Sequence, residues 1–510
     1  MPITYLYFYF IVAIIMVIYY AFPQRIKWII LLIASFLLYT IFGGKRAMFF
    51  MLSGAIAAYI GAIGIAYFRE KQRESAARIY FRVALIIIIG ILAWHNYLNF
   101  FIENFNYGIR KLGGGDFQIP VIQALAPLGI SFYSLSLISY LIDVYWGIQE
   151  AEKNIGKVIL YGCYFPVVTT GPILKYNKFH EQITKKITLD YENICFALQR
   201  ILWGVFKKAV LADYFYIIVQ EVFANDINYA GSIVLATGYL SSIQLYLNFS
   251  ASIDIVLGIS QLFGIELPEN FNRPFSSCTI TELFRRWHIS LGNWLKDYIY
   301  YPLMKSSFLQ SAREKAGKKF GKKAGKKVST FGAMLIMWMM NGVWHGAKWK
   351  YIIGVGLLLW GIMLLEDLFE PYRLKMVRKV GIKQSSKIYL WIRRAFMYTK
   401  FSIMMIFFSA DGVIHGIKIL YHMIKNFLVK PNFAFLLDLG FSTERIIIIG
   451  LEFCIYLWIV HIASKTDVRK WLASRKIWFR WSIYYLIILS ILLFSANGTD
   501  VMEGFIYAQF

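Results

Sequence analysis

One histidine stands in an apolar stretch of the chain where an imidazole side chain is unexpected. His345 lies in MNGVWHGAKWK, residues 340–350, between Trp344 and Gly346. A neutral imidazole can take a proton from a hydroxyl group near neutral pH, so this histidine could act as a general base. The alternative is a histidine that only forms hydrogen bonds inside a helix bundle. The stretch by itself is compatible with both interpretations.

The neighbours of His345 could complete a site around it. Asn341 precedes His345 by four residues, so both side chains would lie on one face of a continuous helix. Trp344 could form the wall of a pocket beside the imidazole. We therefore predict that Asn341 and Trp344 contact a substrate.

A second histidine, His288, lies in ELFRRWHISLGNWLKDYIYYPL, residues 282–303. Apolar side chains recur there at helical spacing, which predicts an amphipathic helix at the membrane surface; they are Leu283, Trp287, Leu291 and Trp294. Arg285 and Arg286 could pair with the phosphates of an anionic ligand, which would then pass Trp287 and His288. The alternative is an interfacial helix anchored by its Trp and Arg side chains.

The elements that must hold these histidines are membrane helices. The 510 residues are 58% hydrophobic and only 16% charged, whereas soluble chains have about a quarter charged residues. Several apolar windows approach or exceed the ~18 residues that read as a membrane-spanning helix; they are 3–22, 26–42, 445–462 and 481–493. The sequence predicts an all-α polytopic protein of the cell membrane, with about 10–13 spanning or re-entrant segments.

The net charge of +25 is concentrated in loops between the apolar windows, which is the positive-inside pattern of membrane proteins rather than a nucleic-acid-binding surface. The basic loops predicted to be cytoplasmic are 69–82, 305–327, 373–394 and 465–480. This assignment places both termini outside the cytoplasm. The segment 305–327 ends in the repeat KAGKKFGKKAGKK, which predicts a flexible solvated loop. The alternative is a helix that lies on anionic lipid.

Proline and glycine interrupt the apolar pattern in three regions, 120–180, 265–304 and 328–366. Non-helical backbone at membrane depth needs protein or water around it, so such breaks are typical of sites. We expect one membrane domain over 1–510, consisting of N-terminal spans (1–119), a catalytic core (120–366) and C-terminal spans with an extracytoplasmic tail (367–510). The four cysteines are scattered, and the sequence predicts no metal site and no bound cofactor.

Several motifs in a fixed order resemble the membrane-bound O-acyltransferase family. They include GVFKKAVLAD, LPENFNRPF, RRWHISLGNWLKDYIYYPL and MNGVWHGAKW, and the region around FFSAD is similar to the branch that O-acetylates alginate. The resemblance implies a ring of helices around a thin centre pierced by a tunnel. It implies that His345 is catalytic and that His288 lies towards the cytoplasmic entrance. The chain departs from the family pattern DFSGYSD, where it has NFSASID with Asn248 first; Asp254 is retained as a predicted substrate contact.

The resemblance also implies the reaction and its partners. The donor would be acetyl-CoA or an acyl-carrier thioester, and the acceptor a hydroxyl of an exported polysaccharide or of an extracytoplasmic SGNH-like acetyltransferase partner, in a setting of membrane lipids. In the aromatic tail, Tyr507 could carry the acyl group transiently, or it could anchor the tail at the membrane interface. The alternatives are a D-alanyl transferase of the teichoic acid type and, from another class, a transporter or flippase.

Overall fold

The computed structural model of the chain describes residues 6–113, 117–122 and 126–496. Its regular elements in these ranges are helices, apart from an isolated β-bridge between Phe271 and Trp287. The N-terminal helices are α1 (Leu6–Ala21), α2 (Gln24–Glu70), α3 (Glu74–Asn96), α4 (Leu98–Lys111), α5 (Ile130–Tyr145), α6 (Ile155–Cys163) and α7 (Tyr176–Thr184).

The middle of the chain alternates long helices with short or π-helical pieces. These are α8 (Tyr191–Phe206), η1 (Lys207–Ala212), α9 (Asp213–Ala224), η2 (Asp226–Asn228), α10 (Gly231–Leu262), η3 (Pro274–Ser276), α11 (Ile280–Arg286), α12 (Ile289–Leu295), η4 (Lys296–Tyr300), α13 (Tyr301–Met304), α14 (Ser307–Phe320), α15 (Lys322–Trp344), α16 (Trp349–Tyr351), η5 (Ile352–Leu357) and α17 (Leu358–Lys379). The C-terminal helices are α18 (Lys387–Ser409), α19 (Val413–Lys425), α20 (Phe435–Asp438), α21 (Thr443–Ala463), α22 (Val468–Ala473) and α23 (Ile477–Phe494).

The described part of the chain has six helical segments long and apolar enough to cross a membrane, and α1 and α5 are shorter apolar helices. The most apolar window of α10 is 83% buried, so α10 belongs to the core. The corresponding windows of α21 and α23 are only 11% and 6% buried, as expected for helices that face lipid. The prediction of an all-α polytopic membrane protein is confirmed.

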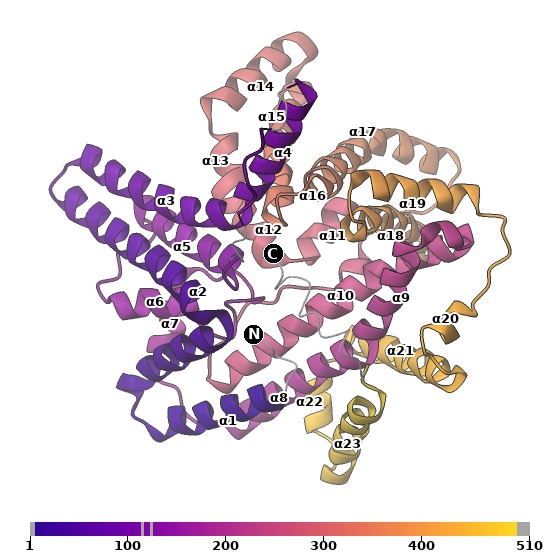
Figure 1. Cartoon of the computed structure of the whole chain (residues 1–510), viewed down its shortest axis with the longest axis horizontal. Coiled ribbons are helices and arrows are strands. Elements are labelled where there is room, and N and C mark those ends of the chain that lie inside the picture. The colour runs from indigo at the N-terminus through magenta and orange to yellow at the C-terminus, as the bar shows by residue number, and fades with distance from the viewer. Residues whose placement is uncertain (1–5, 114–116, 123–125, 497–510) are drawn as a thin grey trace.

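Helix α10 crosses the centre of the molecule, and α8 lies along it (Figure 1). Gly204 of α8 makes this approach possible, because a Cβ atom there would lie 2.8 Å from the Ala251 carbonyl oxygen of α10. Helices α1–α3 and α5–α7 occupy one side of Figure 1, and α17–α19 occupy the opposite side. The two short helices α11 and α12, which flank His288, lie between these groups.

The predicted break in the apolar pattern before residue 180 is a stretch of buried irregular backbone. Residues 164–175 form turns and extended segments, and nearly all of them are buried in the protein. Gly129, which begins α5, has φ +70°, and a Cβ atom there would lie 1.9 Å from the Val168 carbonyl oxygen. Only glycine fits this close contact between α5 and the irregular segment.

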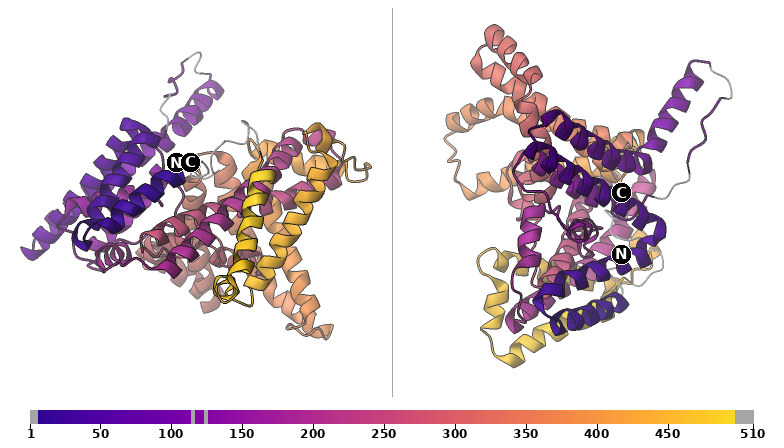
Figure 2. Two further views of the ribbon diagram at one scale, coloured as in Figure 1. Left: turned by 90° about the horizontal axis from the view of Figure 1, so that it is seen from below. Right: turned by 90° about the vertical axis from the view of Figure 1, so that its left-hand side faces the viewer.

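Two helical arms project on opposite faces of the molecule (Figure 2). The first is α4. The second is the hairpin of α14 and the beginning of α15, which corrects the prediction of a flexible loop over 305–327. The Ser306 side chain caps α14 by accepting a hydrogen bond from the backbone N–H of Leu309. Gly325 packs against α14, since a Cβ atom there would lie 2.4 Å from the Arg313 carbonyl oxygen. Glycines that suggested flexibility instead allow two helices to pack closely.

Candidate functional site

His288 and His345 line one cavity of about 1220 Å³. Its walls come from α11, α12, α15, α17 and α18, so segments more than 100 residues apart in sequence enclose it. The lining of α18 lies beyond the segment 120–366 that we expected to hold the site, and it includes Arg393, Lys400 and Phe408.

One face of α15 supplies a row of lining residues at alternating spacings of three and four. The row consists of Phe331, Met334, Trp338, Asn341 and His345. This spacing keeps the side chains on one side of an α-helix. The prediction that Asn341 and His345 share a helical face is therefore confirmed, because α15 continues to Trp344.

His345 caps the end of α15, and its backbone N–H donates to the Asn341 carbonyl at 3.2 Å. Gly346 follows with φ 116°, a conformation that side chains other than glycine rarely adopt, and it ends the helix. The imidazole is buried among aromatic rings: its centroid lies 4.9 Å from Trp344 and 5.7 Å from Phe408. This setting fixes the ring and keeps bulk water away from it.

The segment after His345 reaches the α4 arm. The Trp349 indole N–H donates to the Asn104 side-chain oxygen at 2.8 Å, and its ring lies 5.5 Å from that of Phe100. At the other end of α15, Lys327 pairs with Asp367 at 2.5 Å, and Asp367 lines the cavity. The lining of the cavity thus runs along α15 from the α14–α15 hairpin on one face of the molecule towards the face that bears α4 (Figure 2).

His288 lies at a break between two short helices, which corrects the prediction of one continuous amphipathic helix. α11 ends at Arg286, and His288 precedes α12 in a left-handed conformation with φ 47° and ψ 52°. Asn270 holds this turn: its backbone oxygen accepts from the N–H of Ile289 at 3.0 Å, and its Oδ1 accepts from the N–H of Ser290 at 2.9 Å. The spacing of apolar residues could not reveal a turn fixed by a segment 18 residues earlier.

Trp344 separates the two histidines without lining the cavity itself. Its ring centroid lies 5.7 Å from that of His288 and 4.9 Å from that of His345. Its indole N–H donates to the Ser131 carbonyl of α5 at 3.4 Å, and its ring meets Phe132 edge-on. Trp344 therefore fixes both imidazoles relative to α5.

Charged side chains gather at the hairpin end of the cavity. Arg285 and Lys296 line it, and burial together with the Arg285 cation lowers the pKa of Lys296. Two cations this close favour a polyanionic ligand between them. The acidic lining residues have basic partners: Glu366 pairs with Lys400, and Glu370 pairs with Arg373. Lys296 was not among the sequence-based site residues.

Comparison with known proteins identifies the family. The family model of the membrane-bound O-acyltransferases matches residues 152–316, which include His288 and end before His345. The chain is 30% identical over 336 residues to the probable alginate O-acetylase AlgI of Azotobacter vinelandii. The aligned region covers 66% of this chain and 62% of that protein. The chain belongs to the membrane-bound O-acyltransferase family.

Two relatives that are named for other activities are also similar to this chain. The peptidoglycan O-acetyltransferase of Helicobacter pylori is 27% identical over 60% of this chain and 58% of that protein. The teichoic acid D-alanyltransferase of Bacillus subtilis is 29% identical over 49% of this chain and 60% of that protein. The matched part spans about three-fifths of the length of each of these relatives.

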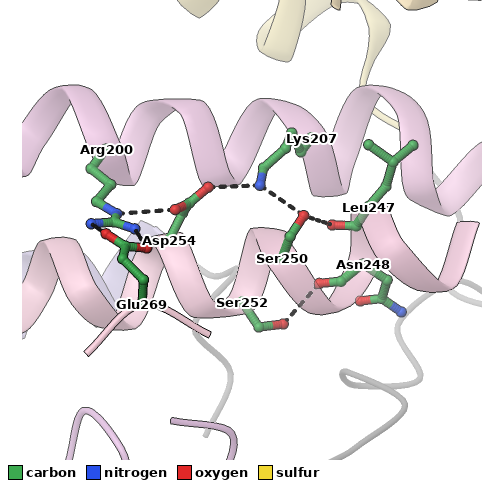
Figure 3. A network of polar contacts seen from close by, with 8 residues as sticks. All are labelled: Arg200, Lys207, Leu247, Asn248, Ser250, Ser252, Asp254 and Glu269. Atoms are coloured by element: carbon green, nitrogen blue, oxygen red, sulfur yellow. Dashed lines mark hydrogen bonds and ion pairs between the residues drawn. The ribbon is translucent and has the colours of Figure 1, made fainter. Parts of the chain in front are cut away.

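Like Trp344, two further predicted site residues, Arg286 and Asp254, lie away from the cavity lining. Arg286 turns from it and pairs with Glu282 at 3.0 Å, whereas Arg285 and Trp287 line the cavity. Asp254 lies in a paired cluster between α8, η1 and α10 (Figure 3). Its two oxygens accept from Arg200 at 3.0 Å and from Lys207 at 2.6 Å.

The paired cluster extends to the segment that holds His288. Arg200 also makes two hydrogen bonds to Glu269, at 2.7 and 2.6 Å, and Glu269 directly precedes Asn270 (Figure 3). Lys207 donates a further bond to Ser250 at 2.9 Å. The cluster therefore joins α8 and α10 to the turn at His288.

Tyr507 lies outside the described residues. Among the described residues, no group of three or more His, Cys, Asp or Glu side chains could hold a metal ion. The chemistry that the cavity can support consequently has to be argued from its histidines, Asn341 and its cationic end.

Proposed function

We propose that this protein transfers a short acyl group, acetyl in the first instance, from a thioester donor to a hydroxyl group at the cell surface. The observation that carries the proposal is that His288 and His345 line one cavity with Arg285 and Lys296 at its hairpin end. Membership of the membrane-bound O-acyltransferase family supports the same reaction class.

In the proposed reaction, His345 removes the proton of the acceptor hydroxyl as its oxygen attacks the thioester carbonyl carbon. The C–O bond forms, the C–S bond breaks, and the thiolate leaves and recovers the proton from the imidazolium. The negative charge on the carbonyl oxygen needs a hydrogen-bond donor, and the Asn341 amide on the same face of α15 is our candidate. His288, at the turn between α11 and α12, is proposed to contact the thioester as it enters.

The two ends of the cavity suit different substrates. The cations at the hairpin end suit an anionic thioester such as acetyl-CoA, so we propose that this face is cytoplasmic. The α4 face, next to the segment that follows His345, would then be extracytoplasmic, together with both termini. There the acceptor would be an exported polysaccharide or an SGNH-like acetyltransferase that passes the group on, and Tyr507 would carry the acyl group between the cavity and this acceptor.

A D-alanyl transferase that uses a carrier-protein thioester is the second candidate. The similarity to a teichoic acid D-alanyltransferase favours it, but the alignments to the two O-acetylating relatives cover more of the chain. A transporter or flippase would need coupling carboxylates inside its spans. Asp254 is instead paired with Arg200 and Lys207, and Asp143 accepts hydrogen bonds from Tyr298.

The test is acyl transfer by membranes that contain the protein. Membranes from cells that express the wild-type chain are supplied with radiolabelled acetyl-CoA or with a labelled aminoacyl carrier protein, and alkali-labile label on polysaccharide is counted. We expect label from acetyl-CoA and none with membranes of the H345A variant. Label from the carrier protein alone would favour D-alanyl transfer. Equal label in wild-type and H345A membranes would refute the assignment.

A further inference from the structure

Trp338 differs from three other tryptophans near the site, Trp294, Trp344 and Trp360. The indole N–H groups of Trp294, Trp344 and Trp360 each donate to a backbone carbonyl, of Leu135, Ser131 and Phe331 respectively. Trp338 is only 6% exposed and lines the cavity, yet its Nε1 has no hydrogen-bond partner among the described residues. Buried indole N–H groups normally find an acceptor, because an unpaired one costs about 1–3 kcal/mol.

The position of Trp338 along the cavity is defined by α15. It lies seven residues before His345 on the lining face, and therefore about 10 Å from it along the helix axis. Lys327, whose partner Asp367 marks the hairpin end, lies eleven residues further back on the same helix. The ring of Trp338 is held edge-on to Phe284 of α11 at 4.8 Å. Trp338 thus stands between the cationic end and the proposed base along α15.

A thioester donor that enters from the cationic end would place a hydrogen-bond acceptor next to Trp338. In both coenzyme A and carrier proteins, the thiol belongs to a pantetheine arm with two amide groups. In the extended arm the two amide carbonyl carbons lie about 5 and 10 Å from the sulfur. With the sulfur near His345, the distal amide would lie level with Trp338.

We propose that Trp338 donates a hydrogen bond to the distal amide carbonyl of the pantetheine arm of the donor. The proposal rests on the proposed function, because it takes a pantetheine thioester as the substrate. It makes Trp338 a residue that sets how far the donor enters, so that the thioester carbon stops beside His345. The hydrogen bond would recognise the pantetheine arm, and this arm is common to coenzyme A and carrier proteins.

Binding of unreactive thioethers tests this assignment without turnover. S-ethyl-pantetheine has both amides, whereas the S-ethyl thioether of N-acetylcysteamine has only the proximal one. W338F removes the N–H and keeps an aromatic ring against Phe284. We expect W338F to bind S-ethyl-pantetheine about 3- to 10-fold more weakly than the wild type, which corresponds to one hydrogen bond, and to bind the shorter thioether equally well.

The matched control is W360F, since the Trp360 indole already donates to the Phe331 carbonyl and does not line the cavity. It should leave the affinity for both thioethers unchanged. A second test needs no variant: an S-ethyl-pantetheine in which a methylene replaces the distal carbonyl should bind the wild type about 3- to 10-fold more weakly than the parent. Equal binding of the two compounds would overturn the proposal, as would equal binding of S-ethyl-pantetheine to wild type and W338F.

S-ethyl-CoA and a carrier protein bearing an S-ethyl-pantetheine arm distinguish the two sources of the donor. Both should lose the same factor in W338F, and the one that binds the wild type more tightly identifies the source. If the wild type bound no pantetheine thioether, the proposed donor class and the role of Trp338 would both fall. If W338F-sensitive binding were present without any acyl transfer, only the proposed reaction would be refuted.

Discussion

The paired cluster around Asp254 and the cavity around His345 both bury polar side chains, but they do so in opposite ways. In the paired cluster, Asp254 accepts from both Arg200 and Lys207, so the charges compensate one another inside the protein. In the cavity, Trp338 and Asn341 project from one face of α15 into a space of about 1220 Å³. Buried polarity that is compensated internally supports the fold, and buried polarity that faces a cavity is available to a ligand.

The difference separates two residues that the sequence motifs had put together. Asp254 and His345 were both predicted to contact substrate, and only His345 lines the cavity. Asp254 would then act at a distance, since its partner Arg200 also holds Glu269 beside Asn270. Three predictions test this division between a supporting cluster and a reacting cavity.

The largest effect is expected for H345A. Loss of a general base lowers the rate of acyl transfer by about 10²–10⁴-fold, while the cavity position should leave the unfolding temperature nearly unchanged. Initial rates with labelled acetyl-CoA and thermal unfolding in detergent measure the two quantities. H461A is the control, because His461 is exposed at the end of α21. A loss of stability in H345A comparable to its loss of activity would mean that His345 supports the fold instead.

A substantial effect of the opposite kind is expected for D254N. Removing the Asp254 charge leaves the buried Lys207 without a counter-charge, because Arg200 keeps its pair with Glu269, and this costs about 3–5 kcal/mol of folding free energy. Thermal unfolding of purified protein measures the loss. The matched control is D297N, which breaks the partly exposed pair with Lys175 and should cost no more than about 1 kcal/mol. If the D254N protein had wild-type stability but bound substrate more weakly, Asp254 would contact the substrate, as the sequence predicted.

The smallest effect concerns pH at the cationic end. The lowered pKa of Lys296 means that its ammonium loses a proton at a lower pH than an ordinary lysine. The charge is present below this pKa and disappears above it, so the KM for acetyl-CoA should rise on the alkaline side, by about 3- to 10-fold.

The variant K296R and a neutral donor serve as controls for this pH dependence. K296R keeps its charge at alkaline pH, so its KM for acetyl-CoA should stay flat there. S-acetyl-pantetheine carries no phosphates, so its KM should not depend on Lys296. An equal alkaline rise for both donors would exclude Lys296 as a phosphate contact.

The sequence predicted what depends on local spacing. The helical character of the chain and the shared face of Asn341 and His345 follow from hydrophobicity and from a four-residue interval, and both are confirmed. The turn at His288 was missed because Asn270, a distant residue, fixes it. The α14–α15 hairpin was missed because glycine suggests flexibility in one helix, whereas Gly325 serves contact between two. Trp338 followed the same 3–4 spacing as His345 and could have been found from it.

The left-handed backbone at His288 has a consequence for how this protein balances stability against function. A residue other than glycine in this conformation costs on the order of 1 kcal/mol. His288 keeps the left-handed conformation only because the hydrogen bonds to Asn270 impose it. Glycine would relieve the strain and favour the folded state at this position. A screen that selects only for thermal stability would therefore tend to replace His288 with glycine, and it would remove the imidazole from the cavity in doing so.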